Sequence, residues 1–313
     1  MRQDFVQKLK AFVIEGTILE QEPMDRHTTF AVGGPANLFV EPASREELRL
    51  IVKTARQEGV PFFVTGNGSN LLVSDQGYRG MILHLGRLMS RIVVNDHMID
   101  AEAGASLARI AREALEHGLT GLEFAAGIPG TLGGALVMNA GAYGGEMKQV
   151  VTEAEVLTGD GEILTIPAED LDLSYRHSSI MDKGYIALSA RLSLSAGDPD
   201  RIRSRMNELA LARREKQPLE YPSAGSTFKR PEGYFAGKLI QDAGLKGYTA
   251  GGAQVSDKHS GFVINRGGAE ACEIRFLIRQ VQKKVYRQFG VMLEPEIRFL
   301  GFEEEQNTDV FFF

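Results

Sequence analysis

The sequence contains a single cysteine, Cys272, among 313 residues. One cysteine excludes an intramolecular disulfide and a cysteine-based metal cage, so we expect no metal site. The same scarcity indicates a reducing compartment, for which the cytoplasm is the simplest choice. Cys272 falls near the start of an amphipathic helical pattern, where we expect it to pack rather than react.

Long apolar runs and blocks of basic residues are also lacking. No segment is apolar for long enough to cross a bilayer, and residues 1–10 carry charges where a signal peptide would be apolar. A net charge of −6 without a Lys/Arg-rich block argues against nucleic acid or an anionic membrane as a partner. With 43% apolar residues, the chain can fill two or three domains.

The spacing of apolar residues predicts a mixture of helices and strands after an amphipathic N-terminal helix. A strand, a glycine turn and a second strand are expected over residues 30–40, and Ser44 with Glu47 predicts a capping box before the next helix. Further strands are expected at 61–65, 81–85, 92–94, 98–103, 151–157, 163–166, 185–194 and 262–265, and further helices at 106–116, 198–216, 234–243 and 274–289. The strands between 151 and 194 predict a largely antiparallel layer, and the basic end of the helix at 198–216 is expected to be mostly solvated.

A glycine-rich loop, Gly66-Asn67-Gly68-Ser69-Asn70, follows the strand at 61–65. Its glycines permit unusual dihedral angles and bring backbone N–H groups close to an anion, for which phosphate is a natural ligand. A simple turn is the alternative, because such loops often follow strands.

Residues 121–145 are rich in glycine and nearly free of charge, which makes them unusual as a mere connection. Backbone amides at 127–134 are candidates for binding a diphosphate, and residues 139–144 for packing against a flat ring system. A Gly/Ala-rich helix packed in a core is the alternative.

The stretch Tyr221–Pro231 places Ser226 in a tight turn, and Lys229 and Arg230 follow it. A hydroxyl beside two cations suits an anionic ligand whose reacting carbon receives a proton from Ser226. A surface turn with solvated charges is the alternative.

Two further charged residues stand out. Arg176 is able to clamp a carboxylate or phosphate, or to form an ion pair at the end of a strand. Glu296 follows a proline that forces an extended backbone, and it is either a catalytic carboxylate or an ordinary acid at a strand end.

Six short motifs, taken in order, resemble UDP-N-acetylenolpyruvoylglucosamine reductase, the FAD enzyme family of bacterial cell-wall precursor synthesis. The resemblance covers roughly residues 28–301, and six motifs in order are more specific than any one of them. The motifs are Gly66-Asn67-Gly68-Ser69-Asn70, Ala126-Gly127-Ile128-Pro129-Gly130-Thr131-Leu132-Gly133-Gly134, Asn139-Ala140-Gly141-Ala142-Tyr143-Gly144, Ser174-Tyr175-Arg176, Ala224-Gly225-Ser226-Thr227-Phe228-Lys229 and Leu293-Glu294-Pro295-Glu296.

The resemblance implies an α+β fold with a PCMH-type FAD-binding domain at 1–196, in two lobes of about 1–85 and 86–196. An α+β substrate-binding domain would follow at 197–313, with its last strand, near 296–300, returning to the FAD-binding part. Tight, non-covalent FAD binding is implied for Gly66, Asn67, Gly68, Ser69, Asn70, Gly127, Ile128, Pro129, Gly130, Thr131, Gly133, Gly134, Asn139, Gly141, Ala142 and Tyr143.

The resemblance also implies the reaction. NADPH would reduce the flavin, which would then pass a hydride to UDP-N-acetylglucosamine enolpyruvate and yield UDP-N-acetylmuramate, a precursor of peptidoglycan. The matching positions make Ser226 the proton donor, and Arg176 and Glu296 the groups that manage the developing enolate. We further expect Lys229 to stabilise the serine alkoxide, and Tyr175, Lys229 and Arg230 to contact the substrate.

Two departures from the family pattern limit what the resemblance implies. Ala31 stands where many members have a basic residue, so we do not count that strand as an anion contact. The short path from Arg176 to Tyr185 indicates the shorter subtype, which lacks a tyrosine-bearing loop insertion. Another FAD oxidase or dehydrogenase on the same scaffold, or a non-catalytic nucleotide-binding module, remains open as an alternative.

Overall fold

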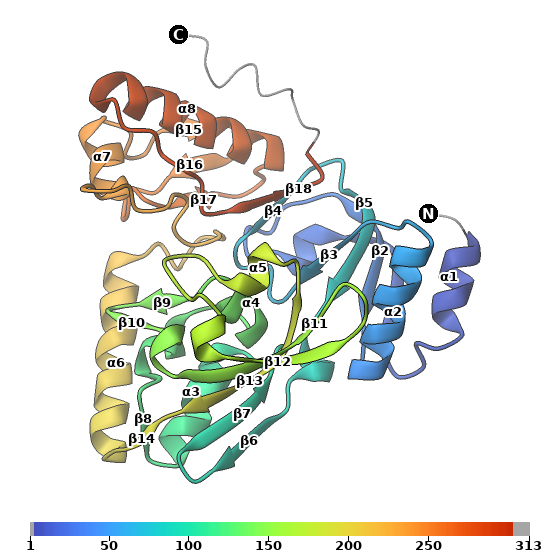
Figure 1. The fold of residues 1–313 in the computed structure, drawn as a ribbon. Coiled ribbons are helices and arrows are strands. Elements are labelled where there is room, and N and C mark those ends of the chain that lie inside the picture. The colour runs from blue at the N-terminus through green and yellow to red at the C-terminus, as the bar shows by residue number, and fades with distance from the viewer. Residues whose placement is uncertain (1–2, 303–313) are drawn as a thin grey trace. The chain divides into compact units, whose positions relative to one another are not determined.

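The computed structural model describes residues 3–302. Figure 1 shows the helices α1 (Gln3–Lys10), α2 (Arg45–Gln57), α3 (Leu107–Glu116), α4 (Leu132–Val137), α5 (Ser179–Asp182), α6 (Pro199–Lys216), α7 (Ala236–Asp242) and α8 (Ala271–Phe289). Short 3₁₀ helices are η1 (Met24–His27), η2 (Arg87–Met89), η3 (Glu123–Gly127), η4 (Met147–Gln149) and η5 (Ala168–Asp170). The C-terminal Phe311–Phe313, to which the sequence assigns no role, lies outside the described residues.

The strands are short. They are β1 (Thr17–Pro23), β2 (Pro35–Glu41), β3 (Phe62–Thr65), β4 (Leu71–Val73), β5 (Tyr78–His84), β6 (Ile92–Asn95), β7 (Met98–Glu102), β8 (Leu119–Thr120), β9 (Gly141–Ala142), β10 (Gly145–Glu146), β11 (Val151–Leu157), β12 (Ile163–Pro167), β13 (Ile186–Ser193), β14 (Ser195–Ala196), β15 (Thr249–Ala250), β16 (Ala253–Val255), β17 (Val263–Asn265) and β18 (Arg298–Leu300). The mixture confirms the α+β fold class.

Two local predictions were wrong in part. The strand expected from residue 30 is irregular, because Ala31 has a φ of 54°, and β2 begins only at Pro35. Ser44 caps α2 as predicted, since its Oγ accepts a hydrogen bond from the Glu47 N–H at 3.1 Å. The Glu47 carboxylate, however, accepts hydrogen bonds from the N–H groups of Ile14, Glu15 and Ala43 instead of completing a capping box.

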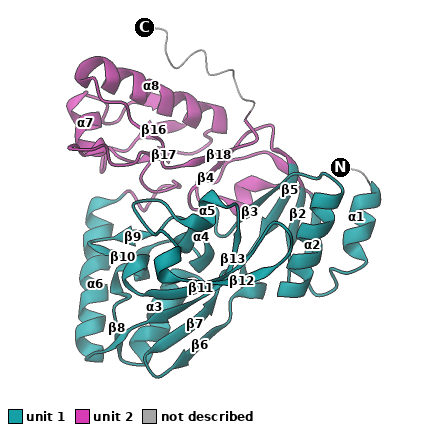
Figure 2. Cartoon of the chain, in the orientation of Figure 1, with its two compact units in different colours: residues 1–20, 38–68, 80–217 teal, residues 21–37, 69–79, 218–313 magenta. Residues whose placement is uncertain are grey.

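The chain forms two compact units, which Figure 2 shows in different colours. Unit 1 comprises residues 1–20, 38–68 and 80–217, and unit 2 comprises 21–37, 69–79 and 218–313. The chain passes between the units within β1, β2 and β5, which share a four-stranded sheet in the order β1-β2-β5-β3. The division at residue 197 and the two lobes stay predictions.

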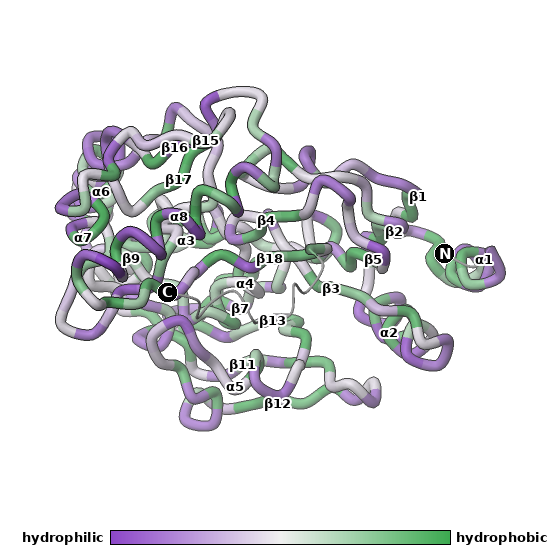
Figure 3. Tube along the Cα trace, turned by 90° about the horizontal axis from the view of Figure 1, so that it is seen from above, coloured by the Kyte–Doolittle hydropathy of each residue, from purple (hydrophilic) through white to green (hydrophobic). Residues whose placement is uncertain are grey.

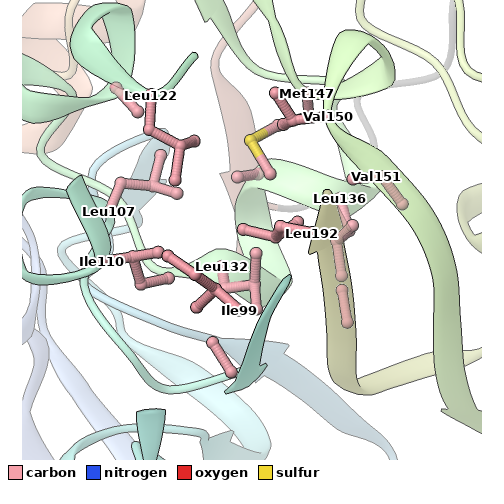
Figure 4. Close-up of a cluster of buried hydrophobic side chains, with 14 of the residues drawn as sticks. Ile99, Leu107, Ile110, Leu122, Leu132, Leu136, Met147, Val150, Val151 and Leu192 are labelled. Carbon is pink, nitrogen blue, oxygen red and sulfur yellow. The ribbon is translucent and has the colours of Figure 1, made fainter. Parts of the chain in front are cut away.

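A five-stranded antiparallel sheet in the order β12-β11-β13-β7-β6 lies within unit 1 and confirms the expected antiparallel layer. Helix α4 packs on β7 and β13, and α3 contacts β6. Figure 4 shows the apolar side chains that fill this core, among them Leu107 and Ile110 of α3, Leu136 of α4 and Leu192 of β13. Each such side chain stabilises the fold by about 1.5–3 kcal/mol when it is fully buried.

A second core of unit 1 joins α1 and α2 to strands of the N-terminal part. Leu48, Ile51, Val52 and Ala55 are buried, as their helical spacing predicts. The tube in Figure 3 accordingly alternates between apolar green and polar purple along α2.

Unit 2 is built on the antiparallel sheet β15-β16-β17, against which α8 packs an apolar face. The predicted face is confirmed, because Ile274, Leu277, Ile278, Val281 and Val285 are buried. The last strand, β18, pairs in parallel with β4.

The prediction that Cys272 packs was wrong, because this cysteine is exposed. Asp75 accepts hydrogen bonds from the N–H groups of Ala271 and Cys272, at 2.7 and 2.8 Å, and so caps α8 from outside the helix. Desolvation and the neighbouring Glu270 raise the pKa of the Cys272 thiol to about 11, so the reactive thiolate is scarce near neutral pH. Within residues 3–302, no helix is long and apolar enough to span a membrane.

Candidate functional site

The two glycine-rich segments meet within unit 1. A Cβ on Gly66 would lie 2.2 Å from Thr131 Oγ1, so only glycine permits this approach. Asn67 Nδ2 donates to the Pro129 carbonyl oxygen at 3.1 Å, and Gly68 has a φ of 59°. Loops separated by about 60 residues in the sequence therefore form one surface of backbone and small side chains.

The segment around Thr131 contains a loop followed by a helix packed in the core, and diphosphate binding by its backbone amides stays a prediction. Residues 128–131 form the loop against Gly66, whereas α4 is a short helix with Leu132 and Leu136 buried in the core. Gly133 N donates to the Ala103 carbonyl at 2.8 Å, and a Cβ on this glycine would come within 3.0 Å of the Ala103 side chain. The glycines thus let the loop end in a helix that begins close against the sheet.

Asn139 is a buried connector. Its side chain is 1% exposed, its Nδ2 donates to Glu146 Oε2 at 2.8 Å and to the Ser174 carbonyl at 3.1 Å, and its Oδ1 accepts from Lys148 N at 2.9 Å. Sequence reasoning missed this structural role, since nothing in the motif indicates which groups the amide contacts. Contact between Asn139 and FAD stays a prediction.

Arg176 lies on the turn that Asn139 supports. Ser174 and His177 exchange backbone hydrogen bonds of 3.2 and 3.3 Å, so residues 175 and 176 form the tip of a tight turn. Arg176 has a φ of 57°, and its guanidinium carbon lies 5.2 Å from the centroid of the exposed Tyr175 ring. The positive φ makes Arg176 a strained position in a tight turn, and contact of its side chain with a ligand stays a prediction.

Left-handed backbone conformations occur at several predicted site residues. Besides Arg176, Asn139 has a φ of 40° and Tyr143 a φ of 53°. Such conformations cost a non-glycine residue roughly 1–3 kcal/mol, and functional sites are one place where they cluster. All three residues belong to unit 1, and the sequence predicted all three as site residues.

Ser226 and Glu296 come together in unit 2. The segments pair in antiparallel fashion around Phe228 and Pro295, and Glu296 N donates to the Thr227 carbonyl at 2.8 Å. Thr227 is fully buried and is fixed from the other side, because its Oγ1 accepts from Val263 N at 2.9 Å. The exposed Ser226 directly precedes Thr227, whose carbonyl accepts the hydrogen bond from Glu296 N. The backbone therefore places Ser226 and Glu296 in neighbouring segments. The convergence of Arg176 with this pair stays a prediction.

Asn70 also has a role that the sequence did not predict. Its Nδ2 donates to the Glu296 carbonyl at 3.0 Å, and its own carbonyl accepts from Arg298 N at 3.0 Å. The last residue of the first glycine-rich motif thus holds the backbone of the candidate catalytic carboxylate.

The cations after Ser226 have partners within unit 2. The Lys229 ammonium forms an ion pair with Glu294, and its role in stabilising a serine alkoxide stays a prediction. The Arg230 guanidinium lies 3.9 Å from the centroid of the Phe235 ring, which is 61% exposed. Substrate contacts of both cations stay predictions.

Two known protein-family models match this chain. Residues 217–300 match the family model described as UDP-N-acetylenolpyruvoylglucosamine reductase, C-terminal domain, and residues 36–167 match an FAD binding domain. A relative named UDP-N-acetylenolpyruvoylglucosamine reductase from Agathobacter rectalis is 53% identical over 96% of this chain and 99% of its own. This chain belongs to the UDP-N-acetylenolpyruvoylglucosamine reductase family.

Other members of the reductase family are also similar over nearly the whole chain. A relative of the same name from Caldanaerobacter subterraneus subsp. tengcongensis is 54% identical over 96% of this chain and 99% of its own. The crystal structure of UDP-N-acetylenolpyruvylglucosamine reductase from Thermus caldophilus covers 91% of this chain and 98% of its own, with 35% identity and a TM-score of 0.78. The protein is therefore an FAD-dependent oxidoreductase, and the non-catalytic alternative is not retained.

The geometry of unit 1 fits FAD. A Cβ on Gly66 would clash with Thr131, so the two loops lie in close contact, and their glycine backbone is of the kind that binds phosphate groups. Between Arg176 and β13 the chain forms only a turn and the four-residue α5, which fits the shorter subtype.

Proposed function

We propose that this protein reduces UDP-N-acetylglucosamine enolpyruvate to UDP-N-acetylmuramate, with NADPH as the reductant, in peptidoglycan precursor synthesis. The names of relatives about 53% identical over nearly the whole chain support the substrate. The observation that supports the chemistry is the 2.8 Å hydrogen bond from Glu296 N to the Thr227 carbonyl. It holds the segment that carries the Ser226 hydroxyl beside the segment that carries the Glu296 carboxyl.

The residues of the chain would act on the proton and the charge. When bound, FAD supplies the two-electron chemistry that takes a hydride from NADPH and delivers it to the vinyl CH₂ carbon of the substrate. The π electrons of that double bond then move to the carbon that bears the carboxylate, and Ser226 donates its proton there. The serine regains a proton from solvent.

Arg176 and Glu296 would stabilise the enolate-like charge. A guanidinium offsets negative charge directly, and a carboxyl helps only as a hydrogen-bond donor, in its protonated form. Tyr175, Lys229 and Arg230 remain candidates for contacts with the sugar nucleotide.

Replacement of Ser226 tests the assignment in two half-reactions. In the Ser226→Ala protein, NADPH should still bleach the flavin, because reduction needs no proton from residue 226. Reoxidation by the enolpyruvyl substrate should be about 10²–10⁴-fold slower, the usual loss when a general acid is removed. Stopped-flow absorbance under anaerobic conditions measures both steps.

Ser223→Ala is the matched control, because Ser223 lies three residues earlier in the same stretch. Reoxidation of Ser226→Ala as fast as that of the control would rule out Ser226 as the proton donor. Rapid oxygen consumption, without oxidation by the sugar nucleotide, would instead favour a flavin oxidase.

A further inference from the structure

Arg213, in the last turn of α6, differs from its basic neighbours. The sequence predicts a solvated basic end for this helix, and Arg214 is indeed exposed. Arg213 is half-buried, its Nε is inaccessible to solvent, and this nitrogen has no hydrogen-bond partner among residues 3–302. The same described residues offer it no carboxylate ion pair.

The Arg213 guanidinium lies against the second glycine-rich loop. A Cβ on Gly127 would be 2.9 Å from Arg213 Nη1 and 3.3 Å from its Cδ, so a glycine at 127 is what permits this contact. Helix α6 packs on η3, which contains Gly127. Within unit 1, the guanidinium therefore lies against the second glycine-rich loop, which the sequence assigns to the cofactor.

A desolvated cation at such a position needs a counter-charge. Burial lowers the pKa of Arg213, which shows that its surroundings disfavour the charged form. The negative end of the helix dipole gives only modest compensation, and the exposed Arg214 and Lys216 could provide that interaction at lower desolvation cost. A bound anion would offset the cost, and the planar guanidinium fork matches phosphate geometry.

We propose that Arg213 binds a phosphate group of FAD at the loop formed by residues 126–130. The inference rests on FAD binding and not on the proposed substrate. Arg213 lies between the two matched ranges, 36–167 and 217–300, so neither family model covers it.

Titration of the apoprotein with flavin compounds tests the contact. Arg213→Gln should weaken FAD binding by about 10- to 100-fold, the scale of a lost hydrogen bond to a charged group. Arg214→Gln, which removes an exposed arginine from the same helix, is the matched control and should change FAD binding by less than about threefold. Equal FAD affinity in Arg213→Gln and the control would overturn the proposal.

Two fragments of FAD locate the contact. ADP carries the diphosphate without the flavin, and riboflavin carries the ring without phosphate. Arg213→Gln should weaken ADP binding as strongly as FAD binding and leave riboflavin binding unchanged. Equal weakening of riboflavin binding would place Arg213 at the ring and contradict the proposal.

Thermal denaturation separates this role from simple packing. The apo form of Arg213→Gln should melt at the same or a higher temperature than the wild-type apo form, because an uncompensated buried charge has been removed. The FAD-loaded variant should melt lower than the loaded wild type, because bound ligand stabilises it less. A lower melting temperature in both forms would indicate a structural role.

Gly127→Ala provides a second test in a protein that keeps Arg213. The added methyl should displace the guanidinium and weaken both FAD and ADP binding, and unchanged affinity for both would count against the proposal. None of these assays contains NADPH or sugar nucleotide, so their failure is distinguishable from failure of the proposed reaction.

Discussion

Each unit contains an asparagine that the sequence assigns to the cofactor, and the two asparagines have different surroundings. Asn139 in unit 1 is buried and its amide makes three hydrogen bonds, one of them to the turn that carries Arg176. Asn70 in unit 2 is partly exposed, and its amide makes one hydrogen bond, to the Glu296 carbonyl. Both support the backbone of a candidate catalytic residue, so a motif can place a residue at a site without revealing its role.

The largest expected difference between the units concerns stability. Asn139→Ala should lower the free energy of unfolding by about 2–4 kcal/mol, since it leaves buried polar groups without partners and puts alanine at a positive φ. Asn70→Ala should cost about 1 kcal/mol, because one partly exposed hydrogen bond is lost. Urea-induced unfolding followed by circular dichroism compares the two variants.

The variant Asn139→Gly serves as the control for backbone conformation, because glycine accepts the positive φ but still removes the amide. It should recover part of the loss. Similar losses for Asn70→Ala and Asn139→Ala would show that burial does not distinguish the two asparagines.

Smaller changes in stability are expected at Arg176 and Ser226 when glycine replaces the residue instead of alanine. The sign of this difference should be opposite at the two positions. In unit 1, Arg176→Gly should be about 1 kcal/mol more stable than Arg176→Ala, because alanine retains the cost of the left-handed conformation. In unit 2, Ser226 has no positive φ, and Ser226→Gly should be about 0.5–1 kcal/mol less stable than Ser226→Ala. Unfolding midpoints of these four variants are the measurement, and the same sign at both positions would contradict the assignment of backbone strain to Arg176 and its absence at Ser226.

The smallest expected effect is a pH dependence of the stability that His177 gives to the turn at Arg176. A hydrogen bond to Asp182, followed by one to the Asp172 carbonyl, raises the pKa of His177. Because the folded-state pKa is above the unfolded value of about 6.5, the stabilisation is complete below that value and is lost as the pH rises through the folded-state pKa.

Melting temperatures between about pH 5.5 and 8.5 measure this contribution near the reference pKa of histidine. The wild-type protein should lose a little more stability across this range than Asp182→Asn, in which the main hydrogen bond to the protonated ring is weakened. Parallel curves for the two proteins would show that the protonated His177 ring does not stabilise the turn. The stretch Tyr221–Pro231, which carries Ser226, contains no histidine, so variants there should follow the wild-type curve.

Much of the fold was predictable because its signals are local. The helical spacing of Leu48, Ile51 and Val52 predicted α2, and alternating apolar residues predicted the antiparallel layer that contains β11 and β13. The irregular segment at Ala31 was missed, because its positive φ follows from tertiary surroundings and not from any preference of alanine.

The candidate site was predictable only as separate motifs. Ser226, Arg176 and Glu296 could be named from residue types and their resemblance to one family, since these residues sit in recognisable turns. Arg213 lies outside every motif, and its sequence context indicates a solvated helix end. Nothing local distinguishes it from Arg214, so its burial against Gly127 could be found only in three dimensions.

The sequence alone determined the element types, the glycine positions and the family, because local propensity and motif order are written along the chain. Tertiary structure decided which residues meet: Gly66 with Thr131, Asn139 with Ser174, and Asn70 with Glu296. These contacts join residues from 35 to 226 positions apart. They depend on how distant segments pack, and no local propensity encodes that.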